Sequence, residues 1–133
     1  MAYEALKTMT FPVGAALAAN VFVVLDSSGN AVVCGDGADA MGVTLEEVTT
    51  AEYTAGRRTI TCAVIAAGGR VMVRAKASTA IAIGDRIASE AVGEAGPAVS
   101  TNNILGWAES VAGNDADQEL VQVLLDKAAR LVP

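Results

Sequence analysis

Residues 21–34, VFVVLDSSGNAVVC, contain two short apolar runs separated by the segment DSSGN at positions 26–30. Valine and other β-branched residues pack well on pleated sheets. Asp26, Gly29 and Asn30 are residue types that favour tight turns. The stretch therefore predicts a β-hairpin, and it indicates a fold that is built from short strands.

The same alternation of strand-like runs and turn residues continues along the chain. Further strand-like runs are MGVTL (41–45), TITCAVI (59–65), VMVRA (71–75), IAIGDRIAS (81–89), VGEAGPAVS (92–100) and ILGWAESV (104–111). Gly68 and Gly69 predict a tight hairpin with positive φ angles between the second and third of these runs. Turn signals every eight to twelve residues or so are typical of sandwiches and barrels. We therefore predict a mainly β fold, a small single-domain β-barrel or sandwich of short strands.

The first 19 residues lack this regular spacing of turns. We predict an extended N-terminal arm over residues 1–19, followed by one β domain over residues 20–133. The arm either packs on its own domain or reaches a neighbouring copy. Its apolar residues are candidates for contact with a partner protein or with other subunits, because they have no evident core to fill. These candidates are Tyr3, Leu6, Met9, Phe11 and Pro12.

The C-terminal segment DQELVQVLLDKAARLVP (117–133) is compatible with two structures. Its early acidic and late basic residues suit a helix dipole. Its density of Val and Leu favours a strand, which we expect to run to about Leu125 and to be followed by an irregular or short helical tail.

Composition describes an apolar domain with few aromatic residues. Of 133 residues, 53% are hydrophobic and 4% are aromatic. The core must therefore consist mainly of Val, Ala, Ile and Leu, each of which buries a modest area. Such a core is small for one domain, so we expect a homo-oligomer to supplement its stability.

The charge balance argues against two classes of partner. The net charge is −6, and the pI is about 4.5. Phosphate backbones and anionic lipids repel such a surface, so we expect neither nucleic acid nor membrane as a partner. An acidic surface also simply keeps a protein in solution. No signal peptide is evident, and FPVGAALAANVFVVL (11–25) is too short to span a bilayer, so we expect synthesis in the cytoplasm.

Residues 34–47, CGDGADAMGVTLEE, match a calcium-binding loop only in part. Counting from Asp36, Glu47 falls at position 12, where such a loop has glutamate. Positions 3 and 5 are Ala38 and Ala40 instead of oxygen ligands, and position 6 is Met41 instead of glycine. No P-loop lysine follows either. The stretch is therefore predicted to be a turn without a metal or a phosphate.

No catalytic arrangement is found elsewhere. The chain has no histidine, so a Ser-His-Asp or Cys-His pair cannot form. Cys34 and Cys62 are predicted to be buried free thiols, with a disulfide as the less favoured alternative. Glu46 and Glu47 are neighbours, so their side chains are expected to point to opposite faces of a strand. The remaining polar or aromatic candidates are expected to have structural roles: Asp115 with Asp117 in a solvated turn, Lys76 as a solvated residue at a strand end, and Trp107 as a core anchor. We predict no catalytic residue, no cofactor, no metal and no enzymatic activity.

The order of the turns resembles that of tailed-bacteriophage capsid decoration proteins, also called cement proteins. The resemblance covers about residues 20–125, and Ile87 stands where the family pattern has valine. The matching positions are Asp26 and Gly29; Gly35, Gly37 and Ala38; Gly42 and Val43; Gly84 and Asp85; and Gly106, Ala108 and Glu109.

This resemblance implies a virion protein that binds the outer surface of an icosahedral head and stabilises it by bridging capsid subunits. The implied partner is the major capsid protein, the implied location is the capsid exterior after synthesis in the host cytoplasm, and a homotrimer is favoured over a dimer. Two alternatives stay open. One is a small β carrier or ligand-binding module in which Lys76 or a barrel mouth binds a cofactor or a sugar, and the other is a trimeric enzyme whose sites lie between subunits.

Overall fold

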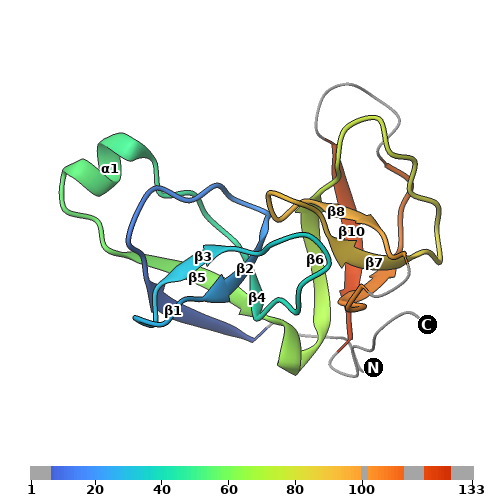
Figure 1. Cartoon of the computed structure of the whole chain (residues 1–133), viewed down its shortest axis with the longest axis horizontal. Coiled ribbons are helices and arrows are strands. Elements are labelled where there is room, and N and C mark those ends of the chain that lie inside the picture. Colours follow the sequence, from blue (N-terminus) through green and yellow to red (C-terminus); the bar gives the residue numbers. More distant parts are fainter. Residues whose placement is uncertain (1–6, 100–101, 113–118, 127–133) are drawn as a thin grey trace, which may run out of the picture.

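The computed structural model describes residues 7–99, 102–112 and 119–126, and these form two five-stranded sheets that lie side by side (Figure 1). The first sheet has the order β1-β5-β4-β2-β3 and the second the order β6-β10-β9-β7-β8, with antiparallel pairing throughout. The sheets share a core and do not close into a barrel over these residues. The prediction of a mainly β, sandwich-like fold is therefore confirmed.

The elements are short, as the spacing of turns predicted. The first sheet contains β1 (Thr8–Pro12), β2 (Phe22–Leu25), β3 (Ala31–Val33), β4 (Gly42–Thr44) and β5 (Thr59–Val64). The second contains β6 (Gly69–Arg74), β7 (Arg86–Ser89), β8 (Ala95–Pro97), β9 (Gly106–Ala108) and β10 (Leu120–Leu125). One helical turn, α1 (Thr50–Thr54), precedes β5, and the 3-10 turn η1 (Ile65–Ala67) follows it.

The predicted hairpin over residues 21–34 is confirmed as β2 and β3, which pair from Val23 with Val33 to Leu25 with Ala31. The Asp26 carboxylate accepts hydrogen bonds from the backbone N–H groups of Ser28 and Asn30, both at 2.9 Å. The prediction of a final strand to about Leu125 is also confirmed, by β10.

The predicted hairpin between residues 59–65 and 71–75 is wrong. Gly68 and Gly69 do have positive φ angles, 75° and 97°. The two strands that they connect nevertheless lie in different sheets, because β1 and β4 already occupy both edges of β5. The two glycines therefore turn the chain from the first sheet into the second.

The two sheets repeat one topology. Adding five to each strand number of the first sheet gives the order of the second. The isolated bridges repeat as well: Val13–Ala31 (parallel) and Leu17–Val48 (antiparallel) in the first sheet correspond to Ala75–Ala95 and Ile81–Ala112 in the second. We call residues 8–65 the first repeat and residues 69–126 the second repeat.

Two glycines show how closely the repeats correspond. A Cβ atom at Gly42 would lie 2.4 Å from the carbonyl oxygen of Ala63, and one at Gly106 would lie 2.3 Å from that of Leu124. Neither distance is sterically allowed, so each repeat needs glycine where its fourth strand pairs with its fifth. The repeats are therefore matched in backbone detail as well as in strand order.

The buried side chains form two clusters. The inter-sheet core is built from residues of both repeats and contains, among others, Phe22, Val43, Ile65, Val73, Ile87, Leu105, Val121 and Val123. The outer core lies on the other side of the first sheet and contains Val13, Leu17, Val21, Ala31, Val23, Val48, Ile60 and Cys62. Successive residues of β2 enter different cores, Phe22 the first and Val23 the second, because side chains alternate across a strand.

We expect Phe22→Ala to destabilise the chain by about 3–5 kcal/mol, because it removes a fully buried aromatic ring and leaves a cavity between the sheets. Denaturant unfolding followed by circular dichroism measures this change. Met9→Ala is the control, since Met9 is 55% exposed and its truncation should change the free energy of unfolding by about 0.5 kcal/mol or less. Similar losses for both variants would contradict the assignment of Phe22 to the core.

Candidate interaction surface

The described part of the predicted arm belongs to the chain's own first sheet. Strand β1 pairs with β5 from Thr8 with Ala63 to Pro12 with Thr59. Met9 and Pro12 are exposed, whereas Phe11 is half-buried and packs against the outer core. Tyr3 and Leu6 lie outside the described residues. Of the three candidate contact residues that the structure describes, Met9 and Pro12 are therefore accessible to a partner.

All four outer sheet edges are covered in part by the chain itself, but β1 is covered only beyond its last residue, Pro12. The Val13–Ala31 bridge joins β3 to the residue that follows β1, and the Ala75–Ala95 bridge joins β8 to the residue that follows β6. Asn20 covers β6: its side-chain amide donates to the Met72 carbonyl at 3.0 Å, and its own carbonyl accepts from the N–H of Arg74 at 2.8 Å. Within the described residues, β1 pairs with β5 on one side and has no strand on the other. An exposed edge of this kind is able to pair with a strand from another chain.

Local hydrogen bonds and ion pairs around α1 stabilise the connection between β4 and β5. Thr49 and Glu52 form a capping box. The Arg57 guanidinium contacts the carboxylates of Glu46 and Glu52, each at 2.9 Å. The pKa of Glu52 is lowered, first by the hydrogen bond from the Thr49 backbone and then by Arg57. Arg57 and both of its acidic partners are thus occupied by structural bonds.

The remaining groups that the sequence singled out are not gathered into a reactive site. Lys76 pairs with Glu90 at 3.3 Å and is half-exposed. Glu46 also accepts the N–H of Thr61 at 2.8 Å. Asp115 and Asp117 lie outside the described residues. In the described ranges, no three His, Cys, Asp or Glu side chains are grouped so that they could hold a metal ion. The helices of this part of the chain are all too short or too polar to cross a membrane.

The expectation that Trp107 anchors the core is wrong. Its side chain is 37% exposed, and its Nε1–H donates to the Asp126 carboxylate at 3.2 Å. Gly106 and Ala108 on either side are buried. Because side chains alternate along a strand, the position between two buried residues of β9 must face outward.

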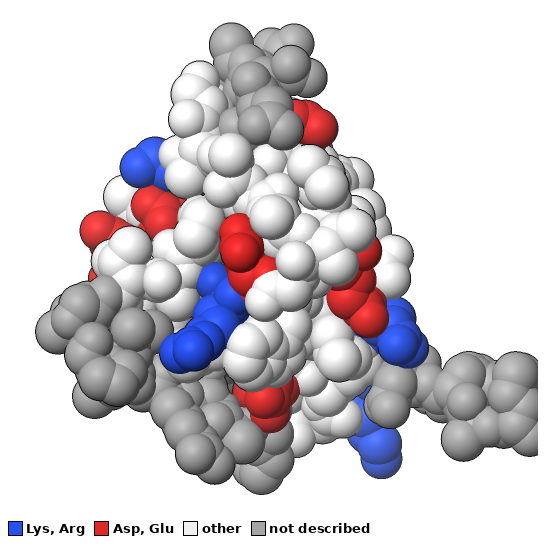
Figure 2. Space-filling view, turned by 90° about the vertical axis from the view of Figure 1, so that its right-hand side faces the viewer, with Lys and Arg blue, Asp and Glu red and all other residues white. Residues whose placement is uncertain are grey.

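Exposed apolar side chains are spread over the second repeat. Figure 2 shows one face of the molecule, on which basic and acidic groups are separated by broad uncharged areas. The most exposed apolar residues in this repeat are Ile83 (69%), Val99 (63%), Val111 (57%) and Val92 (56%). Scattered apolar residues of this kind are common on protein surfaces and do not by themselves mark an interaction site.

The fold is similar to that of the head fiber gp8.5 N base of bacteriophage phi29. The TM-score is 0.66 and the sequence identity 15%, over 95% of this chain and 98% of that chain. No protein-family model and no curated protein sequence matches the chain. At this identity the likeness establishes a shared fold, and it assigns no role to any residue.

The two cysteines are buried free thiols, as predicted. Burial raises the pKa of both, and it brings that of Cys62 to about 11. At pH 8 about one thousandth of Cys62 is therefore thiolate, the reactive form. We expect neither thiol to react with a colorimetric thiol reagent at pH 8 in the folded protein. Both should react in denaturant, and rapid labelling of the native protein would contradict their burial.

Glu94 is a buried carboxyl group at the boundary between the repeats. It is 7% exposed, and its Oε2 atom has no hydrogen-bond partner among the described residues. Burial raises its pKa, and the charges of Arg74 and Lys76 oppose this effect. A raised pKa in the folded state means that the stability contributed by the protonated group is lost as the pH rises through that value.

We therefore expect Glu94→Gln to raise the melting temperature at pH 7, because it removes a buried group that costs free energy when it carries a charge. The difference should shrink as the pH is lowered, because protonation removes that charge from the wild-type side chain. Thermal unfolding at several pH values measures this, and Glu47→Gln, at an exposed position, is the matched control. A lower melting temperature of Glu94→Gln at pH 7 would show that the carboxylate has a stabilising partner.

Proposed function

We propose that this chain is a structural protein of a bacteriophage particle, which binds the outside of an icosahedral head and stabilises it by bridging capsid subunits. The observation that carries the proposal is the shared fold with a phage head fiber base, which extends over nearly the whole of both chains. The order of turns that resembles capsid decoration proteins supports the same conclusion independently of the structure.

The proposed partners are the major capsid protein and further copies of this chain, with a trimer favoured over a dimer. After synthesis in the host cytoplasm, the protein would reside on the capsid exterior. An oligomer that contacts several shell subunits combines small interfaces into tight attachment, because after the first contact the others become intramolecular. The bridged subunits then resist outward pressure from the packaged DNA. The net charge of −6 suits an exterior position, because it repels nucleic acid.

The open edge of β1 is the proposed contact with the shell. In an antiparallel strand, alternate residues direct both backbone groups to the same side. Lys7 and Val13 bond towards β5 through their backbones, so Thr8 and Thr10 direct theirs outward. An extended segment of the shell protein can pair with these groups, while Met9 supplies apolar contact. Tyr3 and Leu6 precede this strand and remain candidate contacts on the sequence evidence alone.

We expect Met9→Glu to weaken attachment to the head about tenfold or more, because it introduces a charge into the proposed contact. The measurement is co-sedimentation with heads of the phage that encodes this chain, prepared without it. Val111→Glu is the control, since Val111 is exposed to a similar extent, 57% against 55%.

Circular dichroism of both variants verifies that they are folded. The proposal also requires that the wild-type protein raises the temperature at which these heads rupture. Failure of the wild-type protein to bind heads would overturn the proposed function. Equal binding of both variants would overturn the role of β1.

A further inference from the structure

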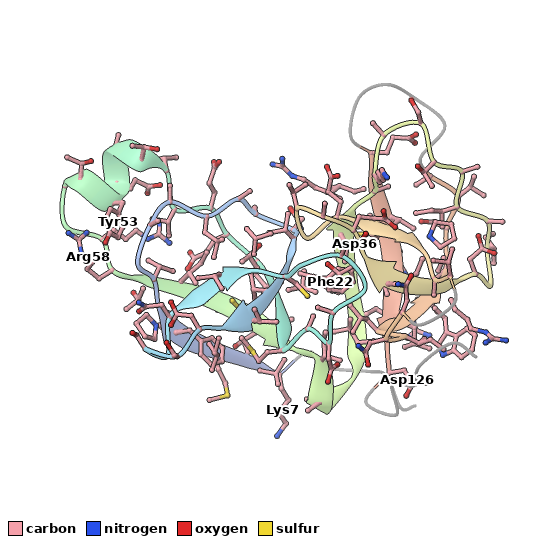
Figure 3. The ribbon with its side chains drawn as sticks, viewed as in Figure 1. Lys7, Phe22, Asp36, Tyr53, Arg58 and Asp126 are labelled. Atoms are coloured by element: carbon pink, nitrogen blue, oxygen red, sulfur yellow. The ribbon has the colours of Figure 1, made fainter. Side chains whose placement is uncertain are left out.

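The two repeats contact each other through different surfaces. The first repeat contributes the start of β2 together with β3. The second contributes the β7–β8 turn, in which Gly93 lies. The Phe22 N–H donates to the Gly93 carbonyl at 2.7 Å. A Cβ atom at Gly93 would lie 2.6 Å from the Phe22 carbonyl and 3.1 Å from Val33, so the turn is seated directly on these strands. We call this contact the junction; Phe22 lies within it in Figure 3.

The junction uses the β2–β3 surface of the first repeat and the β7–β8 turn of the second repeat. Each repeat therefore keeps one surface that the junction leaves unused. In the second repeat this is the surface equivalent to that of β2 and β3, displaced by 64 positions along the sequence. The first repeat has its own equivalent of the β7–β8 turn. We call these the free groove and the free turn. In an interface between unlike surfaces, such leftover counterparts are able to join separate copies head to tail.

The free groove is a cavity of about 290 Å³ that is lined by Asp85, Arg86, Pro97 and Ala98. The Arg86 carbonyl accepts the Ala98 N–H at 2.8 Å, as the Phe22 carbonyl accepts the Cys34 N–H at 2.9 Å. The carbonyl groups of Asp85 and Ile87 accept hydrogen bonds from the β9 side. Because backbone groups alternate in direction along a strand, the Arg86 N–H faces the opposite side, into the groove. No carbonyl in the described ranges accepts it. The Arg86 N–H in the groove is thus equivalent to the Phe22 N–H, which donates to the Gly93 carbonyl at the junction.

The free turn, Asp26–Asn30, has the shape of the turn that is seated at the junction. Gly29 donates to the Asp26 carbonyl at 3.0 Å, and Gly93 donates to the Glu90 carbonyl at the same distance. The φ angles of the two glycines are 84° and 75°. A Cβ atom at Gly29 would meet nothing within 4 Å, whereas one at Gly93 would collide with the first repeat. The two turns therefore have the same shape, but only the turn at Gly93 packs against another part of the chain.

We propose that the free turn of one copy is seated in the free groove of a second copy, with the Arg86 N–H bonded to the Gly29 carbonyl. The surroundings of both surfaces favour association. Leu25, at the base of the turn, is 43% exposed, and Val99, which follows the groove residue Ala98 in the chain, is 63% exposed. Seating the turn would remove these apolar side chains from water.

The contact between copies has fewer hydrogen bonds than the junction. Gly84 is the second-repeat equivalent of Asn20, and it has no side-chain amide to donate. Pro12 is the first-repeat equivalent of Arg74, and it has no backbone N–H. Both bonds that cover β6 are therefore lost at the corresponding edge, β1, which stays available to the shell. This inference rests on the proposed self-association and is independent of shell binding.

The test uses the full-length protein without heads. We expect sedimentation velocity to give the wild type a mass that is a multiple of the 13.4 kDa chain. Leu25→Asp and Val99→Asp should each raise the dissociation constant about tenfold or more, because each places a charge in the contact. Val111→Asp, equally exposed but outside both surfaces, should leave it unchanged. A monomeric wild type, or unchanged association of both variants, would overturn the proposal.

A second measurement covers the case in which a variant fails to fold. Ser28→Cys protein is mixed with Val99→Cys protein under mild oxidation, so that a disulfide between the two variants must join separate copies. Cys34 and Cys62 are buried and should not interfere. More cross-linking in the mixture than in either variant alone supports the proposed contact between the free turn and the free groove. A stable oligomer without this cross-link would overturn that contact and leave the proposed self-association and function intact.

Discussion

The close approach of Gly93 to β2 is the constraint on which the rest of the structure depends. The Gly93 carbonyl accepts the Phe22 N–H at 2.7 Å, and no side chain at position 93 would fit. This contact fixes the distance between the two sheets, so that residues of both can enclose one inter-sheet core. The same arrangement brings Asn20 onto the edge of β6 and buries Glu94. The shared core and the protection of the β6 edge therefore both depend on this backbone contact.

Local sequence predicted the local structure well. The hairpin at residues 21–34 and the strand β10 follow from residue types over a few positions. Pairing between distant strands has no comparable signal, so the turn at Gly68 and Gly69 suggested a hairpin where the chain in fact changes sheets. The duplication was also missed: between residues 17–48 and 81–112, only Ala18, Gly29, Ala31 and Gly42 recur 64 positions later. Two of these four are glycines that the backbone geometry requires.

The candidate surface was predictable only in part. An apolar N-terminal segment indicated contact residues, and Met9 is indeed exposed, but nothing in the sequence showed that Phe11 packs on the outer core. The groove at Arg86 could not be found from residue types, because a backbone N–H defines it. The equal spacing of Gly29 to Gly93 and of Gly42 to Gly106 was the one signal that could have revealed it.

The divergence of the two repeats also bears on how the chain folds. Strands β1 and β6 hold the same place in similar sheets and differ at all five corresponding positions, TMTFP against RVMVR. Tandem copies of one topology are prone to misassembly, in which a strand joins the wrong copy and traps the chain. With proline at one end of β1 and arginine at both ends of the corresponding part of β6, neither strand is a good substitute for the other. The unlike sequences of these two edge strands therefore disfavour an exchange of one for the other during folding.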